Sequence, residues 1–149
     1  MRVPRAVAGE IGLFEVDATW GVIQALKLDA GVETVGELEL FEHARAGALL
    51  VDVRLRRYLD GGTIPGAVNI PSGEIVDRRN ELGGGVVVIF CNGPQCPASG
   101  QAVAALLSVG WPASSLRYYR GGIHDWVTLG LPLAASVPAP PRAPATVAM

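Results

Sequence analysis

The sequence predicts an α/β fold in which helices cover both faces of a mostly parallel sheet. Short apolar, β-branched runs at residues 49–51 and 86–90 are typical of strands buried on both faces. Segments with helical spacing separate the predicted strands, and this alternation implies right-handed crossovers between parallel neighbours. The chain has 149 residues, half of them hydrophobic. This is enough for one domain with a single core and about four or five strands.

The expected elements alternate along the chain. Thr34 and Glu37 have the spacing of a capping box, which predicts the start of a helix. Ser99 is the expected N-cap of a later helix, and Gly110 is its expected stop. We expect helices over residues 35–46, 54–60, 72–82, 99–109 and 123–129, and strands over residues 49–51, 67–70, 86–90 and 116–119.

Both ends of the chain lack a clear hydrophobic period. We expect residues 1–33 to form an N-terminal arm that lies over the domain. The predicted domain spans residues 34–133. Residues 134–149 are rich in alanine and proline, which predicts a disordered tail.

The charge balance limits the classes of binding partner that we expect. Twelve basic and 14 acidic residues give a formal net charge of -2, so we expect neither nucleic acid nor a membrane as partner. No apolar stretch is long enough to cross a bilayer, and the first residues lack the apolar middle of a signal peptide. The expected location is the cytoplasm. Two cysteines and two distant histidines make a poor ligand set, so we expect no metal.

The most informative stretch is the strand over residues 86–90, which runs directly into Cys91 and a polar loop. Ligand sites of parallel α/β sheets lie outside the carboxyl ends of the strands, and helix N-termini attract anions. A thiol held there is stabilised as the thiolate, which is the attacking form. Pro94 and Pro97 have no N–H group, but six other loop residues can donate one to an anion: Asn92, Gly93, Gln95, Cys96, Ala98 and Ser99.

Three charged side chains are candidates for a supporting role. Asp52 and Arg54 follow the neighbouring strand, and we interpret them as an internal ion pair that fixes the loop, with direct chemistry as the alternative. Arg120 precedes a Gly-Gly turn and is a candidate for the positive charge that the cysteine loop lacks. The alternative for Arg120 is a solvated surface arginine.

Three stretches of this sequence, in this order, are similar to the rhodanese-like (sulfurtransferase) domain. They are residues 51–54 (Val-Asp-Val-Arg) leading to residues 62–71 (Gly-Thr-Ile-Pro-Gly-Ala-Val-Asn-Ile-Pro), the strand that ends in Cys91, and residues 120–126 (Arg-Gly-Gly-Ile-His-Asp-Trp) followed by Gly-Leu-Pro at 130–132. The resemblance covers residues 34–133. It implies a five-stranded parallel sheet and a cysteine, matched by Cys91, that holds sulfane sulfur as a persulfide.

The sequence departs from the family pattern at three points. Members that use thiosulfate commonly have an arginine or lysine in the loop, whereas this loop has no charged residue and suits a protein-bound or low-molecular-weight persulfide better. The loop is also longer than the common form, and its second cysteine makes it similar to a Cys-x-Gly-Pro-x-Cys subgroup. The usual histidine of the Gly-His-Ile-Pro-Gly turn is Thr63, which we interpret as a surface variation.

The resemblance and the loop together predict a single-domain sulfurtransferase without a cofactor. The Cys91 thiolate would take sulfur from a small-molecule or protein-bound donor and pass it to a thiol or other nucleophile. The alternatives are a non-catalytic sulfur carrier or binding module, and a dithiol redox protein that uses both cysteines. Cys96 has three possible roles: a plain loop residue, a resolving thiol that closes a disulfide with Cys91, or the persulfide carrier itself.

Overall fold

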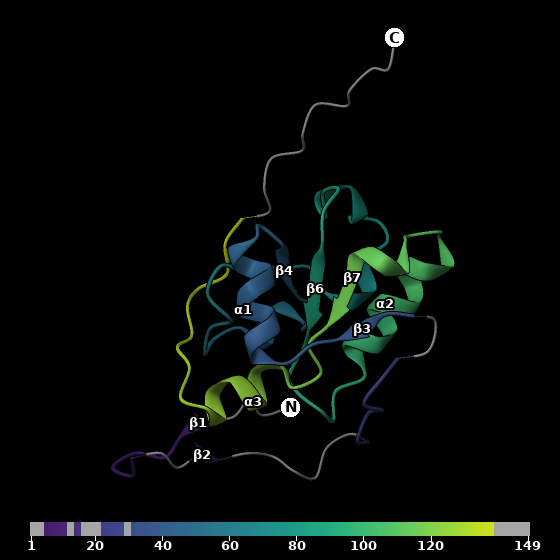
Figure 1. Cartoon of the computed structure of the whole chain (residues 1–149). Coiled ribbons are helices and arrows are strands. Elements are labelled where there is room, and N and C mark those ends of the chain that lie inside the picture. The colour runs from purple at the N-terminus through teal and green to yellow at the C-terminus, as the bar shows by residue number, and fades with distance from the viewer. Residues whose placement is uncertain (1–4, 12–13, 16–21, 29–30, 139–149) are drawn as a thin grey trace.

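The centre of the computed structural model is a five-stranded parallel sheet (Figure 1). The structure describes residues 5–11, 14–15, 22–28 and 31–138. The strand order across the sheet is β3-β7-β6-β4-β5. In chain order the strands are β3 (Glu33–Thr34), β4 (Leu49–Asp52), β5 (Val68–Asn69), β6 (Val87–Phe90) and β7 (Leu116–Tyr118). A separate antiparallel pair joins β1 (Arg5–Ala6) and β2 (Phe14–Glu15).

Helices cover both faces of this sheet, which confirms the predicted fold class. The α-helices are α1 (Glu37–Arg45), α2 (Ala98–Ser108) and α3 (Gly122–Thr128), and four short 3-10 helices are η1 (Arg56–Tyr58), η2 (Ser72–Glu74), η3 (Arg79–Glu81) and η4 (Ala113–Ser115). Alternate residues of β6 point to opposite faces. Val87 and Ile89 join the cluster that contains the buried side of α2, whereas Val88 and Phe90 join the cluster that contains α1 and α3. None of the helices in the described residues is long and apolar enough to cross a bilayer.

Two helices expected from the sequence are shorter and tighter than predicted. The helix expected over residues 72–82 is replaced by η2 and η3, and the helix expected over residues 54–60 is replaced by η1. In the first of these segments only Ile75 and Leu82 are buried, and Gly73 disfavours helix. Too little apolar surface is therefore available to hold a regular α-helix against the sheet.

The two expected N-caps were wrong, and the edge strand β3 was missed. Thr34 lies in β3, where it pairs with Tyr118, and its hydroxyl donates a hydrogen bond to the Leu26 carbonyl oxygen at 2.7 Å. Helix α1 is instead preceded by Gly36, without a side-chain cap. Helix α2 begins one residue before Ser99, so Ser99 lies inside the first turn. A strand of two residues is too short to show a hydrophobic period, which is why the sequence did not reveal it.

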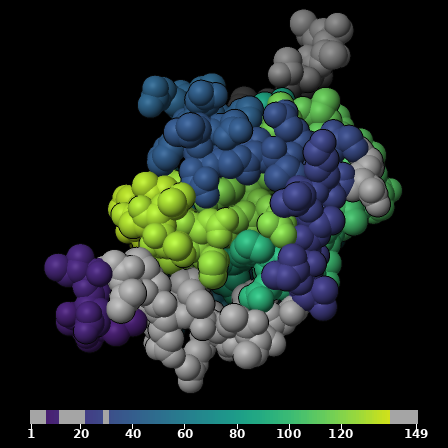
Figure 2. Space-filling view, turned by 60° about the horizontal axis from the view of Figure 1, so that its bottom comes forward, coloured from purple at the N-terminus to yellow at the C-terminus, as the bar shows by residue number. Residues whose placement is uncertain are grey.

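Residues on both sides of the predicted domain contact it. At the C-terminal side, Ala134 pairs with Thr63, and the backbone N–H of Val137 donates to the Ala67 carbonyl at 2.9 Å. Residues 139–149 of the expected tail lie outside the described residues. At the N-terminal side, residues 22–28 lie against the edge of the domain, as Figure 2 shows in dark violet beside the teal loop.

Candidate active site

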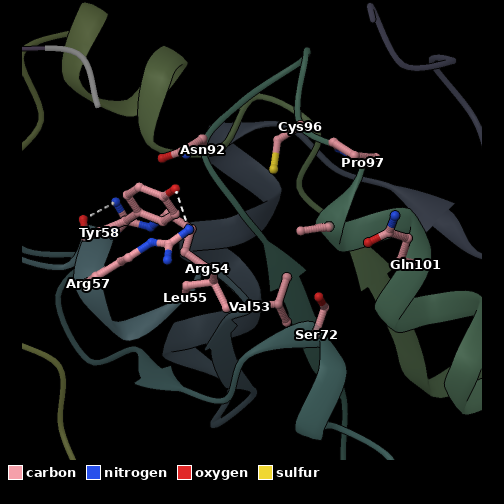
Figure 3. A pocket seen from close by; sticks show the side chains of 11 residues that line it. Val53, Arg54, Leu55, Arg57, Tyr58, Ser72, Asn92, Cys96, Pro97 and Gln101 are labelled. Atoms are coloured by element: carbon pink, nitrogen blue, oxygen red, sulfur yellow. Dashed lines mark hydrogen bonds between the residues drawn. The ribbon is translucent and has the colours of Figure 1, made fainter. Parts of the chain in front are cut away.

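The site lies where the carboxyl ends of β4 and β6 come together. Asp52 and Phe90 are paired in the sheet, so the residues that follow these two strands lie side by side. Between them is a cavity of about 360 Å³, which Figure 3 shows. Its lining comes from both strand ends and from α2, and consists of Val53, Arg54, Leu55, Arg57, Tyr58, Ser72, Asn92, Cys96, Pro97, Ala98 and Gln101. The topology predicted this position, because ligand sites of parallel sheets lie at this edge.

The charged residues at the carboxyl end of β4 form the predicted internal ion pair. Asp52 is fully buried and Arg54 is 2% exposed. The Arg54 Nη2 atom donates to Asp52 Oδ2 at 2.7 Å, and its Nε atom donates to both carboxylate oxygens. Arg54 also donates to the carbonyl oxygens of Tyr58 and Gly62. These contacts hold the segment that follows β4 in place, so that η1 forms one wall of the cavity.

Thr63 is part of this network, and its interpretation as a surface variation was wrong. The residue is fully buried, and its hydroxyl donates a hydrogen bond to Asp52 Oδ2 at 2.7 Å. A buried carboxylate needs several donors to offset the loss of hydration. Thr63 therefore supplies part of what keeps the Asp52 charge stable inside the protein.

Cys91 lies at the tip of β6 and is 2% exposed. Its sulfur lies 3.5 Å from the Cys96 carbonyl oxygen and also interacts with the Cys96 thiol, and Cys91 is not among the residues that line the cavity. Burial raises the pKa of Cys91 well above the ordinary thiol value, and the hydrogen bond and negative charge of Cys96 raise it further.

Cys96 differs from Cys91 in its access to the cavity and in the direction of its pKa shift. Its sulfur points into the cavity (Figure 3), although the residue as a whole is only 3% exposed. The hydrogen bond from Cys91 lowers the pKa of Cys96 to about 6, against the effect of burial. The backbone N–H groups of Ala98 and Asn92 and the charge of Arg54 lower it further. The pKa of a loop thiol is therefore lowered at Cys96, and the catalytic role of Cys91 stays a prediction.

Comparison with known proteins identifies the family to which this fold and loop correspond. A family model described as the rhodanese-like domain matches residues 37–129, which is more than half of the chain. The chain belongs to the rhodanese-like domain family. The domain is also 34% identical over 108 residues to the HTH-type transcriptional regulator Rv0324 of Mycobacterium tuberculosis. That match covers 71% of this chain and 46% of the relative, so the chain spans less than half the length of the curated relative it matches.

Solved structures agree with the rhodanese-like fold. The thiosulfate sulfurtransferase from Pseudomonas aeruginosa is 25% identical, with a TM-score of 0.59, over 71% of this chain and 21% of that chain. The reduced Bacillus anthracis CoADR-RHD is 29% identical, with a TM-score of 0.55, over 66% of this chain and 17% of that chain. The Cys-x-Gly-Pro-x-Cys subgroup stays a prediction.

The Gly-Gly turn of this rhodanese-like domain packs against the backbone of the cysteine loop. The N–H of Ile123 donates to the Cys91 carbonyl at 3.1 Å, and the N–H of His124 donates to the Asn92 carbonyl at 2.7 Å. A Cβ atom at Gly122 would overlap the Cys91 carbonyl oxygen, and a Cβ atom at Gly93 would approach that of His124 to 2.7 Å. The start of α3 therefore fixes the backbone at the two residues from which the loop departs.

Arg120 does not line the cavity. Its Nε and Nη2 atoms donate to the Gln24 carbonyl oxygen at 3.0 and 2.7 Å. The N–H of Gln24 in turn donates to the Pro94 carbonyl at 2.7 Å. Arg120 thus fastens residues 22–28 beside the cysteine loop (Figure 2).

Two further residues that line the cavity were not predicted from the sequence. Arg57 and Tyr58 of η1 line the cavity, and the Arg57 guanidinium lies over the Tyr58 ring, 5.0 Å from its centroid. Both residues follow Asp52 and Arg54 closely in the sequence. The rule that placed Asp52 and Arg54 at the sheet edge could have found them as well.

Proposed function

We propose that this domain is a sulfurtransferase that moves sulfane sulfur from a donor to an acceptor thiol through a persulfide in the cysteine loop. The observation that carries the proposal is the Cys96 thiol, which is buried from bulk water, is directed into a cavity that Arg54 and Arg57 also line, and has a pKa lowered to about 6. A low thiol pKa next to positive charge and helix-end N–H groups is the setting of a reactive cysteine. Both Cys91 and Cys96 are candidates for the atom that carries the sulfur.

The proposed reaction transfers one sulfur atom in two substitutions. The loop thiolate attacks the outer sulfur of the donor, a new S–S bond forms, and the old S–S bond breaks as the leaving group takes the electron pair. An acceptor thiolate then attacks the terminal sulfur, and the loop thiolate is restored. The N–H groups of Asn92 and Ala98, which point at the Cys96 sulfur, stabilise negative charge that develops there.

The cavity favours a small anionic donor. Arg54 is neutralised by Asp52, whereas Arg57 has no carboxylate within ion-pair distance among the described residues. Val53 and Leu55 add apolar wall beside it. A low-molecular-weight thiol persulfide that carries a carboxylate matches this combination, since one end is anionic and the stem is apolar. The similarity to a protein named thiosulfate sulfurtransferase makes thiosulfate the second donor to test.

Mass spectrometry of the intact protein tests the proposal. After exposure to glutathione persulfide or thiosulfate, we expect the protein to gain the mass of one sulfur atom and to lose it to an added thiol, with catalytic turnover. The variant in which both cysteines are replaced by serine is the control and should gain nothing. Stable loading without turnover would favour the sulfur carrier. A reversible disulfide without loading would favour the dithiol redox protein, and unchanged mass with both donors would contradict sulfur transfer.

A further inference from the structure

We propose that Arg120 is a positioning residue for sulfur transfer, which holds the tip of the cysteine loop in place through the backbone of Gln24. The contacts that carry this inference are those of the Arg120 guanidinium, the Gln24 backbone and the Pro94 carbonyl. The inference rests on the proposed function, because its effect is measured as a rate of sulfur loading. It applies to whichever loop thiol carries the sulfur. We call residues 22–28 the N-terminal strap.

The root and the tip of the cysteine loop are held by different parts of the chain. At the root, the first two carbonyl groups of the loop accept hydrogen bonds from the start of α3. At the tip, the N–H of Cys96 donates to the Gly93 carbonyl at 3.0 Å and closes a turn that contains Pro94. A proline has no N–H group, so its carbonyl is its one backbone hydrogen-bonding group. The Pro94 carbonyl accepts the N–H of Gln24 at 2.7 Å, so the strap holds the tip.

Arg120 holds the same strap residue from the other side. While the N–H of Gln24 donates to Pro94, the Gln24 carbonyl accepts two hydrogen bonds from the Arg120 guanidinium, at 3.0 and 2.7 Å. Hydrogen bonds from a charged donor are stronger than neutral ones, and a planar guanidinium fixes their direction as well as their length. Arg120 directly precedes the Gly-Gly turn that packs against the root of the loop. One short segment therefore holds the root through its backbone and the tip through its side chain and Gln24.

The rest of the N-terminal strap is attached mainly at its C-terminal end. Three of its apolar side chains are exposed to solvent, at Val22, Ile23 and Leu26. The Thr34 hydroxyl donates to the Leu26 carbonyl at 2.7 Å, and Leu28 packs beside α2 against the core cluster that contains both loop thiols. Loss of the Arg120 contact would therefore release the part of the strap that holds Pro94 and leave its other end attached.

A direct effect of the Arg120 charge on the site is the alternative to a positioning role. Burial raises the pKa of Tyr118 to about 12, and negative charge at Cys91 and Cys96 adds to this rise, whereas the charge of Arg120 opposes it. Arg120 thus acts on a buried group that both loop thiols also act on. Variants that change the charge and the hydrogen bonds separately distinguish the two roles.

Variants of Gln24 test the hydrogen bonds without changing the charge. Gln24→Pro removes the N–H that the Pro94 carbonyl accepts, and it keeps the carbonyl that Arg120 contacts. Gln24→Ala is the matched control, because it keeps both backbone groups and loses only the side chain, which donates to the Val22 carbonyl. With glutathione persulfide as donor, we expect Gln24→Pro and Arg120→Ala each to slow sulfur loading about tenfold, because small misplacements of reacting groups are costly. Gln24→Ala should load at the wild-type rate.

Steady-state kinetics separate positioning from donor binding. Arg120 does not line the cavity, so kcat should fall in Arg120→Ala while KM for the donor stays within about twofold of the wild-type value. Arg120→Lys keeps the charge but not the planar fork of donors, and it should also lose most of the rate. Arg117→Ala is the control for loss of an arginine that donates to backbone carbonyls. Its partners, Ser114 and Leu116, lie at the opposite end of β7, so the rate should stay unchanged.

Hydrogen exchange tests the hold on the loop without any sulfur donor. In Arg120→Ala and Gln24→Pro, the Cys96 amide should exchange about tenfold faster than in the wild type, because the loop opens more easily. The amides in the middle of α2 should exchange at the wild-type rate. The double variant should show little further change, because both substitutions break the same series of contacts.

Each contrary outcome overturns a different step. Wild-type loading by Gln24→Pro, with slow loading by Arg120→Ala, would show that Arg120 acts through its charge. Unchanged exchange of the Cys96 amide in both variants would show that the strap does not hold the loop. Gln24→Pro and Arg120→Lys give these answers even where Arg120→Ala fails to fold. A wild-type protein that gains no sulfur from either donor would remove the proposed function itself, and the exchange result would still report on the loop.

Discussion

The two strand ends at the site share an edge of the sheet but differ in how their polar groups are paired. At the end of β4, Asp52 and Arg54 are neutralised by each other and by neighbouring donors and carbonyls. At the end of β6, Cys91 and Cys96 share hydrogen bonds, and the Cys96 sulfur faces a cavity.

This difference separates structural charge from reactive charge. The main role of a fully paired buried charge is to fix the chain around it. A charge that is stabilised on one side and faces a cavity on the other can also interact with a substrate. Burial alone therefore does not identify the reactive group, because all four residues at these two strand ends are buried.

The largest expected effect is a loss of stability at the end of β4, where the charges are fully paired. Asp52→Asn keeps the shape of the side chain but leaves the Arg54 charge buried without a counter-charge. We expect a loss of about 3–5 kcal/mol in the free energy of unfolding, measured by urea denaturation. Thr63→Val removes only one donor and should cost about 1–3 kcal/mol. A loss below about 1 kcal/mol for Asp52→Asn would show that the ion pair is not the structural element described above.

The second-largest effect is expected at Gly122, which contacts the backbone of the cysteine loop after β6. At Gly122, with φ of +57°, an added Cβ would overlap the Cys91 carbonyl oxygen and lie 2.8 Å from the Gly93 nitrogen. Gly122→Ala should therefore lower stability by more than the about 1–2 kcal/mol of left-handed strain, and it should slow sulfur loading. Gly130→Ala is the matched control, because Gly130 has φ of +74° and no atom near the added Cβ. Equal losses in thermal melting for both variants would contradict the close contact.

The Cys96 thiol after β6 should make both alkylation and stability depend on pH. The pKa of Cys96 is lowered from the ordinary thiol value to about 6, so its thiolate dominates above that pH. The rate of iodoacetamide alkylation should rise through a midpoint near pH 6, and urea-unfolded protein should show the ordinary thiol midpoint. The same shift stabilises the fold fully above the unfolded-state pKa, and this contribution is lost as the pH falls through about 6. A native midpoint equal to that of the unfolded protein would contradict the described surroundings of Cys96.

The smallest effect is expected at the exposed rim of the cavity. Arg57→Ala should raise KM for an anionic persulfide about two- to fivefold, because exposed charges contribute little in water, and added salt should reduce the difference. Arg56→Ala is the control. Arg56 pairs with Glu74 on the surface and does not line the cavity, so steady-state kinetics and melting temperature should both stay unchanged. Equal KM changes in the two variants would show that Arg57 does not contact the donor.

The sequence predicted most of the fold but not the orientation of its site. The inner strands were found because their apolar runs are buried on both faces, as Val87 to Phe90 are. Sheet topology then placed the residues after β4 and β6 together. What the sequence did not contain was the direction of two thiols in a loop with two prolines. That direction depends on the distant contacts of Gly122, Ile123 and His124 with the loop backbone.

Thr63 and the edge strand β3 are two further features that the sequence alone did not predict. The burial of Thr63 follows from the ion pair beneath it and from its pairing with Ala134, and neither partner is close to it in the sequence. Strand β3 exists because β7 offers it an edge. Features that depend on partners far along the chain leave little local signal.

Ionisation of one loop thiol opposes ionisation of the other. Removing the second proton would put two negative charges close together inside the protein, and the charge of Cys96 accordingly raises the pKa of Cys91. Capping the Cys96 sulfur with an uncharged group removes this repulsion, and Cys91 can then ionise more easily. Chemical labelling of the two positions should therefore be sequential, with the first event changing the reactivity of the second.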